Sequence, residues 1–323
     1  MRAGGLRKPM RIIRDPDYIA KNDRGAAVAI GNFDGVHLGH QAVIDLTRSV
    51  AKRAPLGILT FEPHPRDYFA QISTQSIPPF RLMNAASKAN QLKKLGVERL
   101  YEVPFNDVLA ALTPEDFAQS IIVDRLGLTH VVVGADFCFG KDRAGKAADL
   151  QEFGAVMGFG VTIAPMLATA SGDVSSTAIR SALANGFPRA AAEMLGHWHR
   201  IDGPVITGEQ RGRDLGYPTA NMSIDGLHPP KFGVYAVKVD VLAGPHEGSY
   251  SGAASIGVRP MFGINVPNCE SFLFDFSGDL YGTQLSVALV DYLRGEEKFN
   301  DLEALITQMD TDCSRAREIL SHV

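Results

Sequence analysis

The chain has 323 residues, which is long for one compact core and comfortable for two domains of ordinary size. Hydrophobic residues make up 45% and charged residues 21%, the balance of a folded globular protein rather than a disordered one. The formal net charge of −4 gives no whole-chain reason to expect nucleic acid or an acidic membrane as a partner.

The cysteine pattern and the lack of long apolar stretches bear on where in the cell the protein is found. Cys138, Cys269 and Cys313 lie far apart and fit neither a metal-site spacing nor a disulfide framework, which is typical of a reducing environment. No apolar run is long enough to cross a bilayer, and the basic first ten residues lack the apolar core of a secretion signal. We therefore expect a cytoplasmic protein without a membrane partner.

The first half of the chain alternates strand-like and helix-like segments. The predicted strands are residues 26–30, 56–61, 130–133 and 161–165. A helix is predicted over residues 85–95, closed by Gly96, and another begins at Thr113 and Pro114 and ends near Gly127. Strands separated by helices predict an α/β domain with a parallel sheet, whose ligands bind where the strands end.

The second half changes character after Gly196. Four β-rich segments are predicted over residues 233–242, 249–257, 270–276 and 284–292. The last stretch alone is clearly helical, because its apolar residues from Leu302 to Leu320 fall on one helical face. We predict an antiparallel β-sandwich or β-barrel closed by a C-terminal helix, joined to the first domain around residues 185–200.

A glycine-rich segment follows the first of these strands and opens a helix. It reads Gly31-Asn32-Phe33-Asp34-Gly35-Val36-His37-Leu38-Gly39-His40. Small residues there let backbone N–H groups approach a phosphate, and the helix N-terminus adds a positive dipole. His37 and His40 are three apart, so both rings face one side of the first turn. By themselves the two histidines also fit a capping pair, or a metal pair with His64 as a third ligand.

The same segment resembles the HxGH signature of the nucleotidyltransferase superfamily, in the form found in the bacterial bifunctional riboflavin kinase/FMN adenylyltransferase (FAD synthetase) family. Three later segments match that family in the same order, and the resemblance runs from about Ala27 to the C-terminal helix. These segments are Phe61-Glu62-Pro63-His64-Pro65, Val133-Gly134-Ala135-Asp136-Phe137-Cys138-Phe139-Gly140 with Arg143, and Ser175-Ser176-Thr177-Ala178-Ile179-Arg180.

The resemblance implies a Rossmann-like first domain (residues 1–186) that adenylylates FMN. Residues implied to hold ATP are Gly31, Phe33, Asp34, His37, His40, Ser176, Thr177 and Arg180, with His37 and His40 catalytic. His64, Asp136 and Phe137 are implied to contact the flavin. The alternatives are helix capping for the serine and threonine, a surface arginine, a structural histidine between two prolines, and ordinary core for the phenylalanines.

After a linker helix region (187–199), the resemblance implies a riboflavin kinase domain (200–323). The resemblance of this domain rests on the glycine-rich stretch that ends in Pro218-Thr219-Ala220-Asn221, which looks like the Pro-Thr-Ala-Asn motif of riboflavin kinases. Gly208, Gly216, Thr219 and Asn221 are implied to bind ATP, and Thr219 and Asn221 also Mg²⁺. Composition alone would favour a glycine-rich β-turn with polar tips.

The resemblance places the catalytic base at Glu270, which we expect to begin an apolar strand. It also implies flavin or product contacts for Arg294 and Arg317. A strand-end glutamate and a solvated helix arginine are the structural alternatives. Family members commonly carry Arg-Pro-Thr where this chain has Arg259-Pro260-Met261, and Asn where it has Ser255. We expect both departures in a loop that borders the flavin, where they bear on flavin affinity more than on catalysis.

The expected substrates are therefore riboflavin, FMN and ATP, with Mg²⁺ as cofactor; the oligomeric state stays open. Two other functions compete with this reading. A nucleotidyltransferase for another small phosphorylated substrate would share the first motif, but the Pro-Thr-Ala-Asn domain argues against it. A non-catalytic flavin sensor would be expected to lack the two histidines or Glu270, and all three are present.

Overall fold

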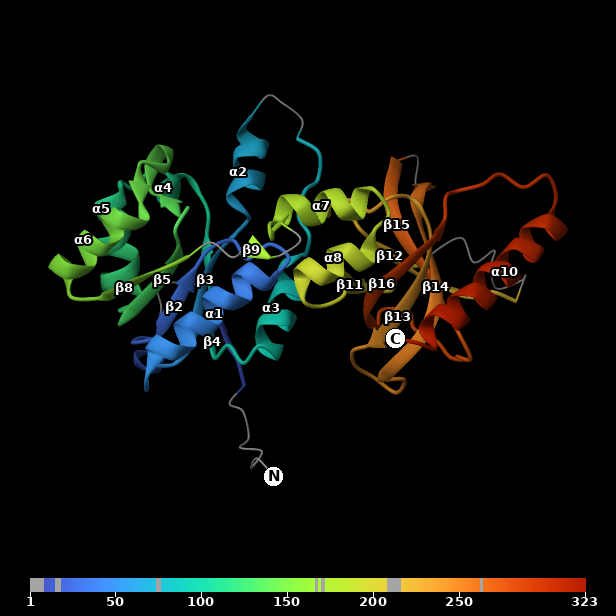
Figure 1. The fold of residues 1–323 in the computed structure, drawn as a ribbon, viewed down its shortest axis with the longest axis horizontal. Helices are drawn as coiled ribbons and strands as arrows, with labels where there is room; N and C mark the ends of the chain where they lie inside the picture. Colours follow the sequence, from blue (N-terminus) through green and yellow to red (C-terminus); the bar gives the residue numbers. More distant parts are fainter. Residues whose placement is uncertain are drawn as a thin grey trace. The chain divides into compact units, whose positions relative to one another are not determined.

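The computed structural model describes residues 9–14, 19–73, 77–165, 168–169, 172–207, 216–261 and 264–323. The chain forms two compact units, which we describe one at a time (Figure 1). Unit 1 consists of Met1–Ile77 and Lys88–Val174, and unit 2 of Pro78–Ser87 and Ser175–Val323. The boundaries predicted above for the catalytic domains, 1–186 and 200–323, stay predictions.

Unit 1 is built on a six-stranded sheet in which every neighbouring pair is parallel. In spatial order the strands are β1 (Arg11–Ile13), β4 (Arg99–Pro104), β3 (Leu56–Glu62), β2 (Ala27–Ile30), β5 (His130–Gly134) and β8 (Gly160–Ala164). The parallel sheet and its four predicted strands are confirmed. We did not predict β1 or β4: β1 has three residues, and Arg99 and Glu102 interrupt the apolar pattern of β4.

Helices cover the sheet and close the core of unit 1. Helix α1 packs across β2, β3 and β5, as Figure 1 shows, and buries Ile44. A large core on β2, β4 and β5 includes Tyr101, Phe117 and Ile122. The helices are α1 (Leu38–Ala51), α2 (Pro65–Ile72), α3 (Ala85–Lys94), α4 (Asp107–Ala110), α5 (Pro114–Phe117), the π-helical η3 (Ala118–Arg125) and α6 (Ala147–Met157); short elements are η2 (Lys21–Asp23), η4 (Lys141–Arg143), β6 (Cys138–Phe139), β7 (Gly145–Lys146), β9 (Ala168–Thr169) and β10 (Gly172–Asp173).

Local signals at the helix ends behave as the sequence predicts. The side chain of Thr113 accepts a hydrogen bond from the backbone N–H of Asp116 and caps α5. Gly96, just beyond α3, has a φ of +78°, a conformation that costs a glycine little. These ends fix where the chain leaves each helix and returns to the sheet.

Unit 2 carries a six-stranded antiparallel sheet. In spatial order the strands are β11 (Arg200–Pro204), β16 (Gln284–Arg294), β13 (Gly233–Val241), β14 (Gly248–Met261), β15 (Ile264–Leu273) and β12 (Thr219–Ser223). An antiparallel bridge between Ile206 and Asn221 joins the chain after β11 to β12, so the sheet curls back on itself. The predicted antiparallel barrel with a C-terminal helix is confirmed in this near-closed form.

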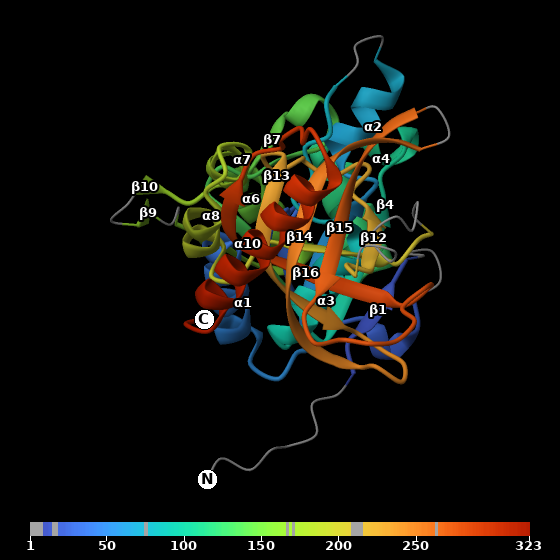
Figure 2. The same ribbon diagram turned by 90° about the vertical axis from the view of Figure 1, so that its right-hand side faces the viewer.

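The helices of unit 2 are α7 (Ser176–Ala184), α8 (Pro188–Leu195) and α10 (Leu302–Leu320). Figure 2 shows α10 lying across the strands of the sheet, where it packs on β13, β14 and β16. Ala316 and Leu320 of α10 join a buried cluster with Phe274 and Val290, and Trp198 packs against it. The helix is thus seated by its second half, since Leu302 at its start is 54% exposed despite the predicted apolar face.

Two details of the prediction for unit 2 are wrong. Glu270 lies within β15 rather than at its start, because polar residues Asn265 and Asn268 concealed the first half of the strand. Ser255 and Met261 lie in β14 and not in a loop; the side chain of Met261 is outside the described residues.

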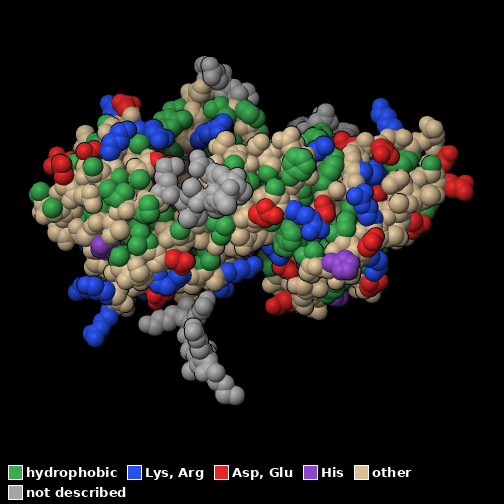
Figure 3. Space-filling view, viewed as in Figure 1, with side chains coloured by type: hydrophobic (Ala, Val, Ile, Leu, Met, Phe, Trp, Pro, Cys, Tyr) green, Lys and Arg blue, Asp and Glu red, His purple; other side chains and the backbone are tan. Residues whose placement is uncertain are grey.

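Among the described helices, none combines the length and the apolar character needed to span a bilayer. Acidic and basic side chains are interspersed on the face drawn in Figure 3, in keeping with the small net charge.

Candidate active sites

The first candidate site begins at the turn that follows β2. This strand lies between β3 and β5, and the chain continues to β3 on one side and later to β5 on the other. Such a switch point is where open parallel sheets leave room for a ligand. In the turn, Phe33 and Val36 have φ of 51° and 46°, and Gly35 has φ of 87°. Two non-glycine residues in the left-handed region mark a turn that its surroundings hold in place.

The two histidines lie together at the start of α1. His37 is the N-cap residue, and its Nδ1 accepts the backbone N–H of His40 at 3.3 Å. The rings stack with centroids 3.6 Å apart, so the prediction that both face one side is confirmed. Gly39 makes room for them, since a Cβ there would lie 3.1 Å from the ring of His37. The glycine of the motif is therefore a packing requirement.

Both rings are held in the neutral form. Burial lowers the pKa of His37 to about 4, partly offset by its own backbone hydrogen bond. Burial also lowers the pKa of His40, followed by the charges of His37 and Lys88. Because Nδ1 of His37 accepts a hydrogen bond, its proton sits on Nε2, where it is available as a donor. Neutral donors beside a phosphate suit charge that develops on oxygen.

The other residues of the turn that were predicted to bind ATP pack beneath the two histidines or lie buried in the turn. Phe33 is 1% exposed, and its ring centroid lies 5.1 Å from that of His40. Asp34 is also buried. A Cβ on Gly31 would touch the ring of Phe33 at 3.4 Å. The turn therefore presents its backbone, and not the ring of Phe33, to a ligand.

The predicted flavin residues follow the ends of β3 and β5. Nδ1 of His64 accepts the backbone N–H of Arg66 at 3.0 Å and caps α2. Asp136 is exposed, and Phe137 stacks on Phe139 with centroids 5.5 Å apart. Both the alternative of a structural histidine for His64 and the packing alternative for Phe137 thus describe real contacts.

An aromatic cluster beside His64 went unpredicted. Tyr68 and Phe69 of α2 meet Phe105 edge to face, with centroids 5.2 and 5.8 Å away, and Phe61 adds a fourth ring. Phe69 and Ile72 remain 50% and 64% exposed. The sequence did carry a signal for this cluster. Phe69 and Ile72 are three residues apart, which places two large apolar side chains on one face of the short helix after the His64 motif.

The second group of predicted phosphate ligands stands at the start of α7, in unit 2. Ser175 is the capping residue, and its side chain accepts the backbone N–H of Ala178 at 3.2 Å. Ser176 and Thr177 occupy the first turn. Arg180 donates to the carbonyl of Phe80 at 3.2 Å and to the hydroxyl of Thr177 at 3.5 Å. The group is therefore ordered around Arg180.

The kinase candidate site is a row of side chains across three strands. Asn221 of β12 stands opposite Glu270 of β15, and Ser255 of β14 stands opposite Glu270 on its other side. Directly opposed side chains in an antiparallel pair have Cβ atoms about 5 Å apart. Asn268 donates to Oε1 of Glu270 at 3.0 Å. Strand register alone thus brings together the two predicted site residues, Asn221 and Glu270, and Ser255, one of the two departures from the family pattern.

Thr219 extends this row by one step, because residues two apart share a face of a strand. It stands opposite Phe272, which is two residues from Glu270 on the same face. Gly216, with a φ of +84°, precedes it. Next to Gly216, the Tyr217 hydroxyl donates to Asp310 of α10 at 2.5 Å, and this bond raises the pKa of Tyr217 to about 12. Gly208 lies outside the described residues.

The two predicted arginines are engaged in ion pairs. Nε and a terminal nitrogen of Arg294 contact Asp312 at 2.9 and 2.8 Å, and Asp312 is 7% exposed. Arg317 contacts both oxygens of Asp275 at 2.8 and 2.9 Å and lies 4.3 Å from the Phe274 ring centroid. The first pair joins α10 to β16, and the second joins α10 to the chain after β15.

The oxygen donors of the row fit a magnesium nucleotide. Mg²⁺ in such sites takes few protein ligands and relies on phosphates and water. Thr219 and Asn221 offer neutral oxygens on one face, with the carboxylate of Glu270 adjacent. Within the described part of the chain, no cluster of three or more histidine, cysteine or acidic residues is arranged to hold a metal, so the predicted alternative of a metal held by His37, His40 and His64 has no support there.

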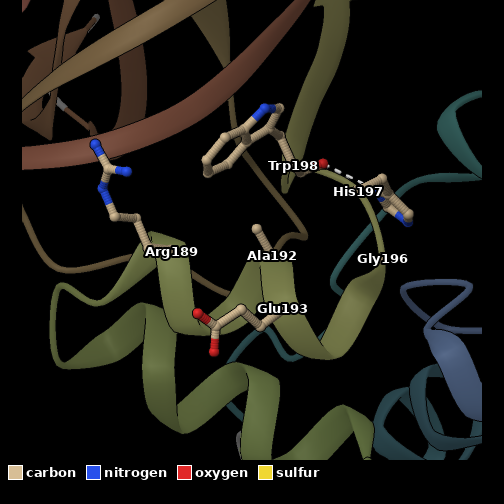
Figure 4. A pocket seen from close by; sticks show the side chains of 6 residues that line it. All are labelled: Arg189, Ala192, Glu193, Gly196, His197 and Trp198. Atoms are coloured by element: carbon tan, nitrogen blue, oxygen red, sulfur yellow. Dashed lines mark hydrogen bonds between the residues drawn. The ribbon is translucent and has the colours of Figure 1, made fainter. Parts of the chain in front are cut away.

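A pocket elsewhere in unit 2 belongs to neither site. It is lined by Arg189, Ala192 and Glu193 of α8 and by Gly196, His197 and Trp198 after it (Figure 4). Nδ1 of His197 contacts the carbonyl of Trp198 at 2.9 Å. None of the residues predicted to bind substrate lines it.

Two family models match successive parts of the chain. The FAD synthetase family model matches residues 19–178, and the riboflavin kinase family model matches residues 195–320. A solved structure from Streptococcus pneumoniae, named a macrolide-efflux protein, is 30% identical with a TM-score of 0.79 and covers 95% of this chain and 98% of its own.

Curated relatives match over nearly the whole length. Bifunctional riboflavin kinase/FMN adenylyltransferases from Pseudomonas fluorescens, Bacillus subtilis and Escherichia coli K12 are 39%, 35% and 35% identical. The alignments cover 96% of this chain in each case, and 98%, 98% and 97% of the relatives. With both candidate sites present in its structure, the chain belongs to the bifunctional riboflavin kinase/FMN adenylyltransferase family.

Proposed function

We propose that this chain makes FAD from riboflavin in two ATP-dependent steps. A kinase domain (200–323) transfers the γ-phosphoryl group of ATP to riboflavin, and an adenylyltransferase domain (1–186) joins the product FMN to AMP. The observation that carries the proposal is that one chain holds both the stacked His37–His40 pair and the Asn221–Glu270 pair.

In adenylyl transfer, a phosphate oxygen of FMN forms a bond to the α-phosphorus of ATP, and the bond to pyrophosphate breaks. No covalent enzyme intermediate is needed, so catalysis is positioning and charge stabilisation. Nε2–H groups of His37 and His40 donate to phosphate oxygens as charge develops. Backbone groups of Gly31, Phe33 and Asp34 hold the nucleotide, and Ser176, Thr177 and Arg180 hold its phosphates. The flavin lies against His64, Asp136 and Phe137.

In riboflavin phosphorylation, the 5′-hydroxyl oxygen attacks the γ-phosphorus and ADP leaves. Glu270 accepts the hydroxyl proton, a role for which its place beside Asn221 and Asn268 is suited. Thr219 and Asn221 hold Mg²⁺, which neutralises phosphate charge when bound. Gly208 and Gly216 let the backbone approach ATP, and Arg294 and Arg317 orient the flavin or the new phosphate around α10.

We further propose the cytoplasm as the compartment, since all three cysteines, Cys138, Cys269 and Cys313, are free thiols in the structure.

The test is product analysis with a variant that removes only the first site. Purified protein is incubated with ATP, Mg²⁺ and either riboflavin or FMN, and the flavins are separated by chromatography. The wild type should form FMN and FAD from riboflavin and FAD from FMN. His37→Ala combined with His40→Ala should still form FMN but no FAD. FAD synthesis by this double variant at the wild-type rate would show that the histidines are not catalytic.

A further inference from the structure

A lysine that no motif includes lies beneath the turn of the first site. Lys88 of α3 is 1% exposed, which makes it one of the largest fully buried side chains among the described residues. Its Nζ donates to the backbone carbonyl of Asn32 at 3.2 Å and to the hydroxyl of Thr60 at 3.1 Å. A carboxylate oxygen of Glu62 lies 3.8 Å away.

Stability alone does not explain a lysine at this position. Burying an ammonium group costs several kcal/mol, and replacing a buried ion pair by apolar side chains is often neutral or stabilising. The other buried residues of α3 are the apolar Ala89 and Leu92 and the small, uncharged Ser87. An apolar residue would therefore serve the packing of this helix at least as well.

The contacts of Lys88 point to the turn. Asn32 follows Gly31 and precedes Phe33, whose φ of 51° places it in the left-handed region. Its carbonyl also accepts the hydroxyl of Thr60 at 3.2 Å, so two buried side chains fix the orientation of one peptide group. Non-glycine residues in this conformation are strained and persist only where the surroundings hold them.

Lys88 also brings charge to the site. Its ammonium is near enough to contribute, after burial and His37, to the lowered pKa of His40. A positive charge in a poorly solvated interior acts over a longer range than one in water. In the proposed site, where the turn receives the phosphates of ATP, this charge would strengthen the attraction for the anion, partly offset by the carboxylate of Glu62 3.8 Å away.

We propose that Lys88 is a positioning residue for adenylyl transfer: from α3 it fixes the carbonyl of Asn32 and places a positive charge behind the turn that receives the phosphates of ATP. This inference rests on the proposed adenylyltransferase function. Lys88 contacts no substrate itself and acts through the backbone of the turn.

The experiment compares Lys88→Met with Lys93→Met. Lys93 is exposed on the same helix, so the control variant loses the same charge. FAD synthesis from supplied FMN is followed with ATP and FMN varied separately, which leaves the kinase site unused. For Lys88→Met we expect the KM for ATP to rise tenfold or more, the KM for FMN to stay within twofold, and thermal stability to hold or increase. Lys93→Met should behave as the wild type.

Two results would overturn the inference. One is an unchanged KM for ATP in Lys88→Met, including the case in which only kcat falls, because that is the mark of a smaller folded fraction. The other is an equal change in Lys93→Met. A wild type that forms no FAD would instead overturn the proposed function.

A second variant tests the same inference in case the Lys88→Met protein does not fold. Thr60→Val keeps the shape of the side chain and removes the other donor to the carbonyl of Asn32. We expect a smaller rise in the KM for ATP, of about threefold. In the double variant, the fold-changes should combine to less than their product, because both side chains act on one peptide group. Independent, fully multiplicative effects would contradict a shared role.

Discussion

The candidate site in unit 1 stands on a turn, whereas the candidate kinase site in unit 2 stands on three strands. The turn needs Phe33 and Val36 in the left-handed region, a glycine under the ring of His37 and a buried lysine from another helix. The kinase row needs only the register that sets Asn221 opposite Glu270.

The two sites therefore differ in what a mutation can disturb. The conformation of the turn depends on side chains that lie far away in the chain, so substitutions outside the motif can change it. A row across strands is held by the whole backbone ladder, so its chemistry depends mainly on the side chains in the row. The predictions below probe this contrast, from the largest expected effect to the smallest.

Glu270→Gln should lower FMN formation from riboflavin by about 10²–10⁴-fold, the range for loss of a general base. Glutamine keeps the hydrogen bond from Asn268 and the strand register, so only proton acceptance is removed. The assay is chromatography of flavins, with FAD formation from supplied FMN as the control in the same molecule. Unimpaired FMN formation would mean that another group accepts the proton.

Arg294→Met should lower the free energy of unfolding of unit 2 by about 3 kcal/mol, because it leaves the buried carboxylate of Asp312 without its cation. Urea unfolding can be followed by the fluorescence of Trp198, the single tryptophan, which packs against the cluster under α10. Asp312→Asn is the matched variant. Stability equal to that of the wild type in Arg294→Met would show that the buried carboxylate of Asp312 does not depend on this ion pair.

Stability of unit 2 should fall as the pH drops from 6.5 to 5. Burial, and then the charges of His197 and His228, lower the pKa of His199 to about 3. Between pH 6.5 and 3 the unfolded chain takes up a proton that the folded chain refuses, so the free energy of unfolding decreases as pH falls. At pH 5 the loss is about 2 kcal/mol.

The pH measurement is urea unfolding by Trp198 fluorescence at pH 5.0, 5.75 and 6.5. His199→Leu should reduce the slope of unfolding free energy against pH, averaged over this range, by about 1 kcal/mol per pH unit. An identical slope in this variant would assign the acid sensitivity to other groups.

Thr113→Ala should destabilise unit 1 by about 1 kcal/mol through loss of the cap on α5. Thr113→Ser keeps the hydroxyl and should match the wild type in thermal unfolding followed by circular dichroism. Both variants should retain riboflavin phosphorylation. Equal stability of Thr113→Ala and Thr113→Ser would mean that the cap contributes nothing measurable.

Much of the fold follows from local patterns in the sequence. Apolar runs predicted β2, β3, β5 and β8, and helix signals at Thr113 and Gly96 placed two helix ends. Strand β4 was not predicted because it contains Arg99 and Glu102. The structure accommodates their charges through ion pairs with Asp23 and Arg14, which lie far away in the chain. The first half of β15 was not predicted for a similar reason: its asparagines interrupt the alternation of apolar and polar residues that identifies a strand.

For the sites, the motifs predicted which residues carry chemistry but not what holds them. The stacking of His37 on His40 follows from their spacing, whereas the role of Lys88 depends on tertiary contacts to Asn32 and Thr60. A lysine four residues before the buried Leu92 was the available signal, because that spacing places it on the apolar face of α3. The ion pair of Arg294 with Asp312 likewise joins residues that no local pattern relates.

The row across β12, β15 and β14 has a consequence for how this chain tolerates insertions and deletions. Side chains in a strand alternate between two faces, and on β15 Cys269, Ser271 and Leu273 point into the core while Glu270 stands on the other face. Adding or removing one codon upstream within β15 would exchange these faces, burying the carboxylate and exposing the core residues. Length changes in the gene should therefore accumulate in the connections between strands, whereas within β15 even one would abolish the kinase and the barrel together.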